Sequence, residues 1–228
     1  QEFREQGFLP EALLNYLFLL GLSPGKDIDL LSLEQMLDYF AINKMSKSPA
    51  VYDMEKLHWM NGQYINSYDP DKIYALLIKL TGDSEIANKI AEYSKEYTLQ
   101  VIKLLRSRVK NIKEIATAGE YFFTEIKEYD AQGVKKYFNR PDSRERLEQI
   151  LNIIKDLNSF AAPVIEKAFR ETAENSGIKA AALIHPARLA VTGRTATPGL
   201  FEVMEILGKQ VCMDRVENAL GFVKSQGS

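Results

Sequence analysis

Apolar residues recur along the chain at intervals of three and four, the spacing that places them on one face of an α-helix. Gly and Pro fall between these periodic segments, where they mark the starts and ends of helices. The sequence shows no convincing alternation of apolar and polar residues, which is the pattern of a half-buried strand. The pattern therefore predicts an all-α fold made of successive helical bundles.

Residues with known capping preferences set the expected helix boundaries. Pro10 suits the first position of a helix that ends at Gly21, and Ser32 with Gln35 forms a capping box for a helix through Tyr39. The other expected helices are Asp53 to Gly62, Asp69 to Leu80, one hairpin or two helices over residues 84–109, Asn111 to Phe123, Asp142 or Ser143 to Ser159, Pro163 to Gly177, two short helices around Thr197, and Val211 to Val223.

Breaks rich in Gly, Pro and Asp suggest where the chain divides into domains. They cluster at residues 23–29, 64–71 and 129–142. We place the boundaries near Tyr68 and Arg140, which predicts three domains over residues 1–68, 69–140 and 141–228.

Composition narrows the possible chemistry. The chain has 228 residues and a formal net charge of −2, which argues against nonspecific nucleic-acid binding but leaves room for a local basic face. Cys212 is the only cysteine, and His58 and His185 are the only histidines, so an intrachain disulfide and a Cys- or His-rich metal centre are excluded. No pairing of a nucleophile with a base stands out, so no catalytic residue is predicted.

The sequence also bears on location. No signal peptide follows Gln1, and no apolar run is long enough to cross a bilayer. A cytoplasmic fragment of a longer protein, without membrane contact, is therefore expected.

Residues 178–201 contain no acidic residue, although the chain as a whole is slightly acidic. Two short apolar pieces flank a turn rich in Thr, Pro and Gly, and the cations are Lys179, Arg188 and Arg194. Guanidinium and hydroxyl groups on such a turn suit an anionic, hydrogen-bonding partner such as unstacked RNA bases. A plain helix connection with solvated Arg side chains is the alternative, and these residues alone leave both open.

A second basic stretch lies in residues 101–113, which contain five cations and no acid. Helical spacing would place Lys103, Arg106 and Lys110 on one face. The face could be solvated, or it could contact phosphates.

Lys44-Met45-Ser46-Lys47-Ser48 spells the ATP-loop motif of class I aminoacyl-tRNA synthetases. The residues before it contain no strand-turn-helix unit, so the motif lacks the nucleotide-binding domain that it requires. An exposed loop without catalytic function is the favoured interpretation.

Three ordered blocks, spread over essentially the whole chain, resemble bacterial-type glutamyl-tRNA synthetases. They are Arg-Glu-Gln-Gly-Phe-Leu-Pro-Glu-Ala-Leu-Leu-Asn-Tyr-Leu at residues 4–17, Ser-Lys-Ser-Pro-Ala-Val-Tyr-Asp-Met-Glu-Lys-Leu at residues 46–57, and Arg-Leu-Ala-Val-Thr-Gly with Pro-Gly-Leu-Phe-Glu, starting at Arg188 and Pro198. In that family the true ATP loop precedes these blocks, so the resemblance makes residues 44–48 a look-alike.

The resemblance implies a C-terminal piece of such an enzyme: a stem-contact region over residues 1–68, followed by two anticodon-binding domains of the α-helix cage type. The partner would be tRNA(Glu), with tRNA(Gln) as a further candidate, and a monomer is expected. The parent enzyme would use ATP and Mg2+ to join glutamate to tRNA. This piece would hold neither a catalytic site nor a cofactor.

The resemblance also implies individual binding residues. Arg188, Thr197, Pro198 and Leu200 would meet the anticodon bases, and Arg108 is the preferred match, within residues 106–110, for an Arg that reads the first anticodon base. Residues expected at the tRNA backbone are Lys47, Lys103, Arg106, Lys110 and Arg194. The alternative function is a helical protein-interaction module that keeps the same fold without binding RNA.

Overall fold

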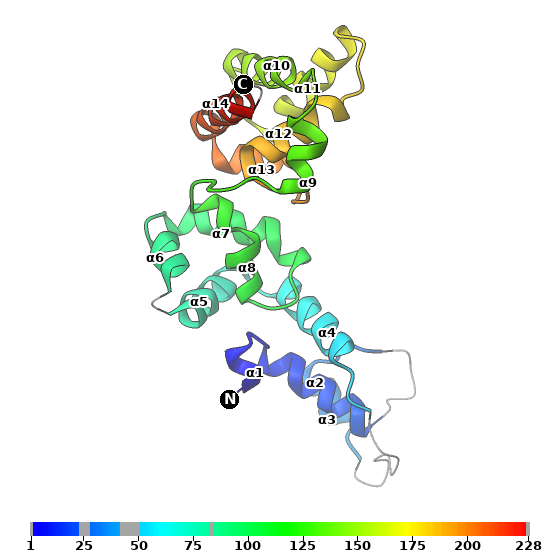
Figure 1. Ribbon diagram of the computed structural model, residues 1–228. Helices are drawn as coiled ribbons and strands as arrows, with labels where there is room; N and C mark the ends of the chain where they lie inside the picture. Colours follow the sequence, from blue (N-terminus) through cyan, green and yellow to red (C-terminus); the bar gives the residue numbers. More distant parts are fainter. Residues whose placement is uncertain (1, 23–27, 42–50, 83, 227–228) are drawn as a thin grey trace. The chain divides into compact units, whose positions relative to one another are not determined.

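The computed structural model describes residues 2–22, 28–41, 51–82 and 84–226, and these residues contain helices and no β-strand (Figure 1). The predicted all-α class is confirmed. Contacts divide the chain into two compact units, Gln1–Glu120 and Tyr121–Ser228. The three-domain division at residues 68 and 140 stays a prediction.

The two units are built from short and medium-length helices. Unit 1 contains α1 (Glu2–Glu5), α2 (Pro10–Gly21), α3 (Leu33–Tyr39), α4 (Met54–Ser67), α5 (Pro70–Thr81), α6 (Glu85–Ala91), α7 (Lys95–Leu105), the 3₁₀ turn η2 (Arg106–Arg108) and α8 (Lys113–Ala118). The 3₁₀ turn η3 (Glu120–Phe122) leads into unit 2, which contains α9 (Ala131–Gly133), the π-helical turn η4 (Val134–Phe138), α10 (Ser143–Asp156), α11 (Ala162–Asn175), α12 (Ala181–Thr192), α13 (Leu200–Leu207) and α14 (Lys209–Gln226). No helix in these ranges is long and apolar enough to cross a membrane.

At α2 and α3 the predicted residues stand at the helix starts, whereas Asp142 makes no side-chain cap bond at the start of α10. Pro10 occupies the first turn of α2, where its missing N–H costs no helical hydrogen bond. At α3 the Gln35 backbone N–H donates to Ser32 Oγ at 3.2 Å, and the Ser32 backbone N–H donates to Gln35 Oε1 at 2.8 Å. This reciprocal pair confirms the predicted capping box.

The prediction that a helix ends at Gly62 is wrong, because α4 continues through it to Ser67. A Cβ at Gly62 would lie 3.0 Å from the Val109 carbonyl oxygen. The glycine therefore permits close approach of the chain near Val109 to α4, and it does not act as a stop signal.

Asn61 joins three parts of unit 1 from a fully buried position on α4. Its Oδ1 accepts a hydrogen bond from the Leu9 backbone N–H at 2.8 Å, and its Nδ2 donates to the Lys110 carbonyl at 2.6 Å. Beside it lie the apolar side chains of Phe8, Leu57 and Met60. The amide thus fixes both the start of α2 and the backbone at Lys110.

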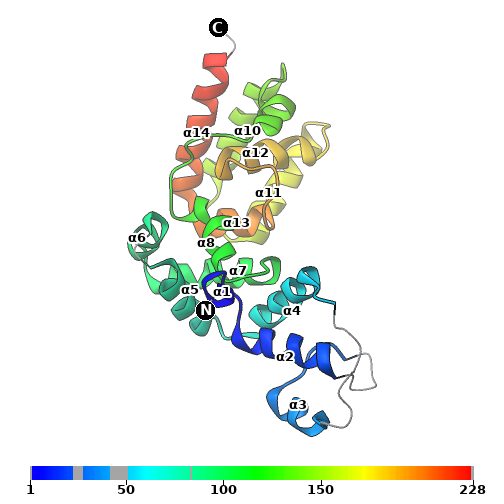
Figure 2. The ribbon, with the colours of Figure 1, turned by 60° about the horizontal axis from the view of Figure 1, so that its bottom comes forward.

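In unit 2, α10, α12 and α14 pack together around a buried apolar core (Figure 2). Arg215 of α14 ties this core to the segment that precedes α9. Its Nη1 donates to the Val191 carbonyl at 2.6 Å, and its Nη2 donates to the carbonyls of Tyr121 at 2.8 Å and Thr124 at 2.9 Å. These charge-assisted bonds hold the C-terminal end of α12 in place.

We expect Asn61→Ala to lower the free energy of unfolding of unit 1 by about 2–4 kcal/mol, because the buried Leu9 N–H would lose its acceptor and the Lys110 carbonyl would lose its donor. Urea denaturation followed by fluorescence of Trp59, the only tryptophan, measures the change. The control Asn88→Ala, at an exposed position of α6, should change stability by less than about 0.5 kcal/mol. Equal losses in both variants would contradict the role of Asn61.

Candidate nucleic-acid interface

The connection between α12 and α13 is the predicted turn flanked by two short helices. α12 ends at Thr192, Gly193 takes a left-handed conformation with φ 73°, and α13 begins at Leu200. The Thr192 hydroxyl donates to the Arg188 carbonyl at 2.7 Å and accepts from the Arg194 backbone N–H at 3.1 Å. These bonds define how the chain leaves α12.

Arg188 spans the turn from the last part of α12. Its Nη1 donates to the Pro198 carbonyl at 2.7 Å and to the hydroxyl oxygen of Thr197. The Thr197 hydroxyl in turn donates to the Pro198 carbonyl at 3.0 Å. The structure therefore brings Arg188, Thr197 and Pro198, three of the predicted base contacts, into one hydrogen-bonded group.

Pro198 and Leu200 are buried, and Leu200 is only 2% exposed. Their side chains anchor the turn and the first turn of α13 inside unit 2. They contribute little apolar surface, so a base stacked broadly against them would require the turn to move.

Gly193 sits against the segment that leads into α9. Its carbonyl accepts a hydrogen bond from the Asp130 backbone N–H at 2.8 Å. A Cβ on Gly193 would lie 2.9 Å from Ile126 Cγ2 and 3.0 Å from the Glu128 carbonyl oxygen. Both its backbone conformation and its surroundings therefore require glycine.

The residues predicted to contact the tRNA backbone fall in both units. In unit 2, the half-buried Arg194 has its guanidinium carbon 5.5 Å from the centroid of the Tyr121 ring. In unit 1, Lys103 and Lys110 are exposed, and so is Arg108, the residue predicted to read the first anticodon base. Lys47 lies outside the described residues.

The expectation that Lys103, Arg106 and Lys110 share one helical face is wrong. α7 ends at Leu105, and the chain reaches Lys110 through the turn η2 and an extended residue at Val109. Arg106 also turns inward, where its Nη1 donates to the Tyr68 carbonyl at 3.1 Å. A helix period cannot show where such a tertiary bond draws a side chain away from its neighbours.

The sequence did not reveal the importance of Arg215 or of Gly193 as a packing position. Arg215 lies in an ordinary amphipathic helix, and its three carbonyl partners come from two distant segments. A glycine after a helix indicates a left-handed end, but it does not show which segment packs against it.

Cys212 and His58 are not arranged for catalysis. Cys212 is fully buried, and burial raises the pKa of its thiol to about 12, so no thiolate forms near neutral pH. His58 Nδ1 lies 2.8 Å from the Met54 carbonyl of its own helix.

Residues 72–220 match the family described as anticodon binding domain. The chain belongs to the anticodon-binding domain family. Residues 1–59 match a second family, described as the catalytic domain of class I tRNA synthetases for E and Q. This second match overlaps most of the predicted stem-contact region, residues 1–68, which stays a prediction.

Individual relatives agree with this assignment. The chain is 48% identical over 223 residues to glutamate–tRNA ligase 1 of Syntrophomonas wolfei, covering 98% of this chain and 44% of the relative. It is 39% identical to glutamate–tRNA ligase 1 of Caldanaerobacter subterraneus, covering 98% and 46%. A crystal structure of a glutamate tRNA ligase from Elizabethkingia meningosepticum matches with a TM-score of 0.85 and 28% identity, over 97% of this chain and 43% of that one.

The resemblance to glutamyl-tRNA synthetases found in the sequence is confirmed. This chain spans less than half the length of the relatives that it matches.

We expect Gly193→Ala to destabilise unit 2 by about 2–4 kcal/mol, because the new methyl group meets Ile126 and Glu128 in addition to the strain of a left-handed residue. Gly177→Ala is the matched control, since Gly177 has φ +63° and open space around its Cβ position. It should cost only about 1–2 kcal/mol. Hydrogen exchange of peptides from α12 and α13 measures the difference, and equal costs would exclude the packing role of Gly193.

Proposed function

We propose that this chain binds the anticodon arm of tRNA(Glu) and does so as part of a glutamate–tRNA ligase. One observation carries the proposal. Arg188 and the Thr197–Pro198 turn form one hydrogen-bonded group within the stretch that matches the anticodon-binding family. A rigid turn that presents a guanidinium, a hydroxyl and backbone groups suits the edges of unstacked RNA bases.

The start of α13 adds donors to this group. The first backbone N–H groups of a helix have no partner within the helix and carry partial positive charge. At α13 these groups follow directly on Pro198 and Gly199. The carboxylate of Glu202 lies against Gly199 at this helix start, so a base carbonyl or phosphate oxygen held near Arg188 would compete with Glu202 for these donors.

The roles of the predicted base contacts differ within this proposal. Arg188 and Thr197 supply hydrogen-bonding groups and hold the turn. Because Leu200 is almost fully buried, it acts by fixing the position of α13. Pro198 presents its backbone and limits the conformations of the turn.

In unit 1, we propose that exposed Arg108 reads the first anticodon base. We assign phosphate contacts to Lys103, Lys110, Arg106 and Arg194, and Lys47 stays a prediction. Arg106 is held by the Tyr68 carbonyl, so any contribution from it combines RNA contact with support of that carbonyl.

For the whole protein, we propose ATP- and Mg2+-dependent joining of glutamate to tRNA(Glu), in the cytoplasm and as a monomer. The names of the relatives support this activity. Charging of tRNA(Gln) is the second substrate to test. If the chain fails to bind tRNA at low salt, a protein-interaction module becomes the better explanation.

We expect Arg188→Ala to weaken binding of tRNA(Glu) by about 1–3 kcal/mol, the range for a good base contact. Fluorescence anisotropy with labelled tRNA measures the loss, and circular dichroism checks the fold. Arg170→Ala, an exposed arginine of α11, is the control with the same charge change and should bind normally. An equal loss on a tRNA with an unrelated anticodon would limit Arg188 to phosphate contact.

We expect Lys103→Ala and Lys110→Ala each to reduce the slope of log affinity against log salt concentration by about 0.7–1, because each removes one phosphate contact. The weakening should be the same for tRNA(Glu) and for a tRNA with an unrelated anticodon. Lys167→Ala, at an exposed position of α11, is the control and should leave the slope unchanged. Unchanged slopes in the Lys103 and Lys110 variants would exclude those phosphate contacts.

A further inference from the structure

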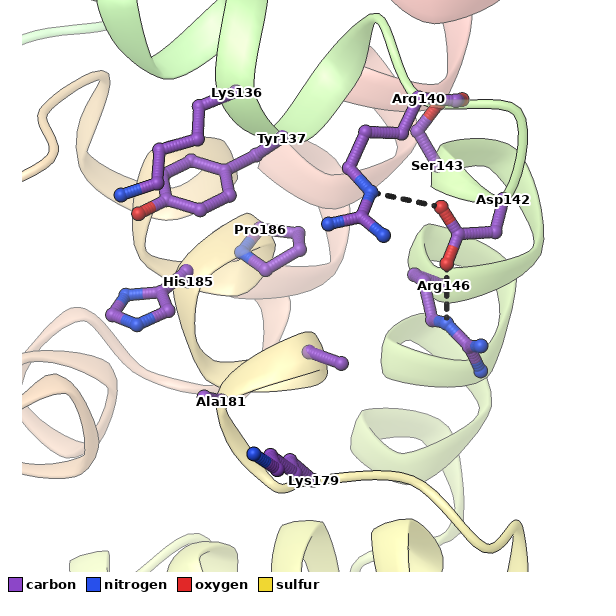
Figure 3. A pocket seen from close by; sticks show the side chains of 11 residues that line it. Lys136, Tyr137, Arg140, Asp142, Ser143, Arg146, Lys179, Ala181, His185 and Pro186 are labelled. Carbon is purple, nitrogen blue, oxygen red and sulfur yellow. Dashed lines mark hydrogen bonds and ion pairs between the residues drawn. The ribbon is translucent and has the colours of Figure 1, made fainter.

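Unit 2 holds a pocket outside the predicted site, between the turn η4, the start of α10 and the first half of α12 (Figure 3). Its volume is about 290 Å³. The chemically active side chains in its wall are Lys136, Tyr137, Arg140, Arg146, Lys179 and His185. Elements from three parts of unit 2 therefore contribute to one concave surface.

Positive charge dominates the pocket. Four of its side chains are Lys or Arg, and Asp142 supplies the one carboxylate in the wall. Asp142 accepts from Arg140 Nε at 3.2 Å and from Arg146 Nε at 3.3 Å, as Figure 3 shows. Burial raises the pKa of this carboxyl, but the two arginines outweigh burial and the net shift is downward, so Asp142 is ionised and orients them.

Arg140 has donors left for a ligand. Asp142 engages its Nε, and within the described part of the chain its terminal Nη groups make no hydrogen bond. The Arg140 side chain is 63% exposed, and Figure 3 shows its guanidinium directed toward the space beside Pro186. A guanidinium held through Nε with its Nη groups open is arranged to bind an oxyanion.

The opposite wall is aromatic. The rings of Tyr137 and His185 stack with centroids 5.2 Å apart and an interplanar angle of 14°. Burial of the imidazole, and then the charges of Arg188 and Lys136, lower the pKa of His185. At neutral pH the imidazole is therefore uncharged, and its ring offers a flat surface to a sugar or base. The Lys136 ammonium lies over the Tyr137 ring, 5.4 Å from its centroid.

Helix α12 connects the pocket with the turn between α12 and α13, because it carries a residue of each. His185 and Arg188 lie three residues apart, so they share one face of the helix with a rise of about 4.5 Å between them. An RNA strand in contact with Arg188 would therefore reach the pocket with its neighbouring nucleotide.

We propose that this pocket binds the phosphate of the nucleotide next to those that Arg188 contacts, with Arg140 and Lys136 on the phosphate and the Tyr137–His185 pair beside the sugar or base. The proposal rests on the proposed function and adds a separate subsite to it. A free phosphate or mononucleotide carries the same chemistry, so the test includes both.

The first experiment measures affinity for tRNA(Glu). The double variant Lys136→Ala/Arg140→Ala should bind about tenfold or more weakly, because it loses charge-assisted hydrogen bonds to a phosphate. Lys167→Ala/Arg170→Ala on α11 is the matched control, since it removes the same two charges from exposed positions, and it should bind as the unaltered chain does. Equal affinities of the two double variants would overturn the subsite.

The second experiment needs no variant of the pocket. The chain has only two histidines, so proton NMR can follow the imidazole titration of His185 without overlap from many other imidazoles. A short single-stranded RNA with the anticodon-loop sequence should raise the pKa of His185, because a nearby phosphate favours the imidazolium. If RNA binds without moving the His185 titration, the subsite is wrong.

Inorganic phosphate and uridine monophosphate distinguish the ligand source. One outcome would be that either compound raises the pKa of His185 while the pocket double variant keeps full tRNA affinity. The pocket would then bind free phosphate compounds, and the RNA subsite would be overturned. Failure of the unaltered chain to bind tRNA at low salt would overturn the proposed function itself. Normal tRNA binding with an unaffected pocket variant would leave that function standing and remove only the subsite.

Discussion

The geometry of the candidate interface depends on the guanidinium of Arg215. Its hydrogen bonds to the carbonyls of Val191, Tyr121 and Thr124 join the end of α12 to the segment that enters unit 2. That end leads into Gly193, which turns the chain against Asp130, and residues 194–199 then run back toward Arg188. Arg215 is half-buried and is not among the residues predicted to contact RNA, yet it supports the site.

Two arginines hold backbone carbonyls in this way, and the chemistry of the guanidinium explains why. Arg215 and Arg188 both donate to backbone carbonyls that no regular helix satisfies. A planar guanidinium can bind several carbonyls at once while keeping its charge, which a lysine ammonium does less well. Arg188 belongs to both the support and the proposed binding surface, so its substitution tests the shape of the turn as well as its contact with RNA.

The distribution of charge reconciles an acidic chain with an anionic partner. The net charge of −2 describes the sum, whereas the cations that matter lie locally in the pocket wall and beside the turn. Within the pocket, Asp142 does not cancel the positive charge but orients Arg140 and Arg146. A net-charge argument averages over such arrangements, which is why it gave only a weak indication against nucleic-acid binding.

Local signals in the sequence determined the helical class, most helix starts and the turn between α12 and α13. Proline at Pro10 and the Ser32–Gln35 pair act within a few residues, so their effects can be read without the fold. The tertiary structure decided the continuation of α4 through Gly62, the inward course of Arg106, the burial of Leu200 and the assembly of the pocket around Arg140. Each of these depends on contact between residues far apart in the chain, and helical periodicity contains no information about such contacts.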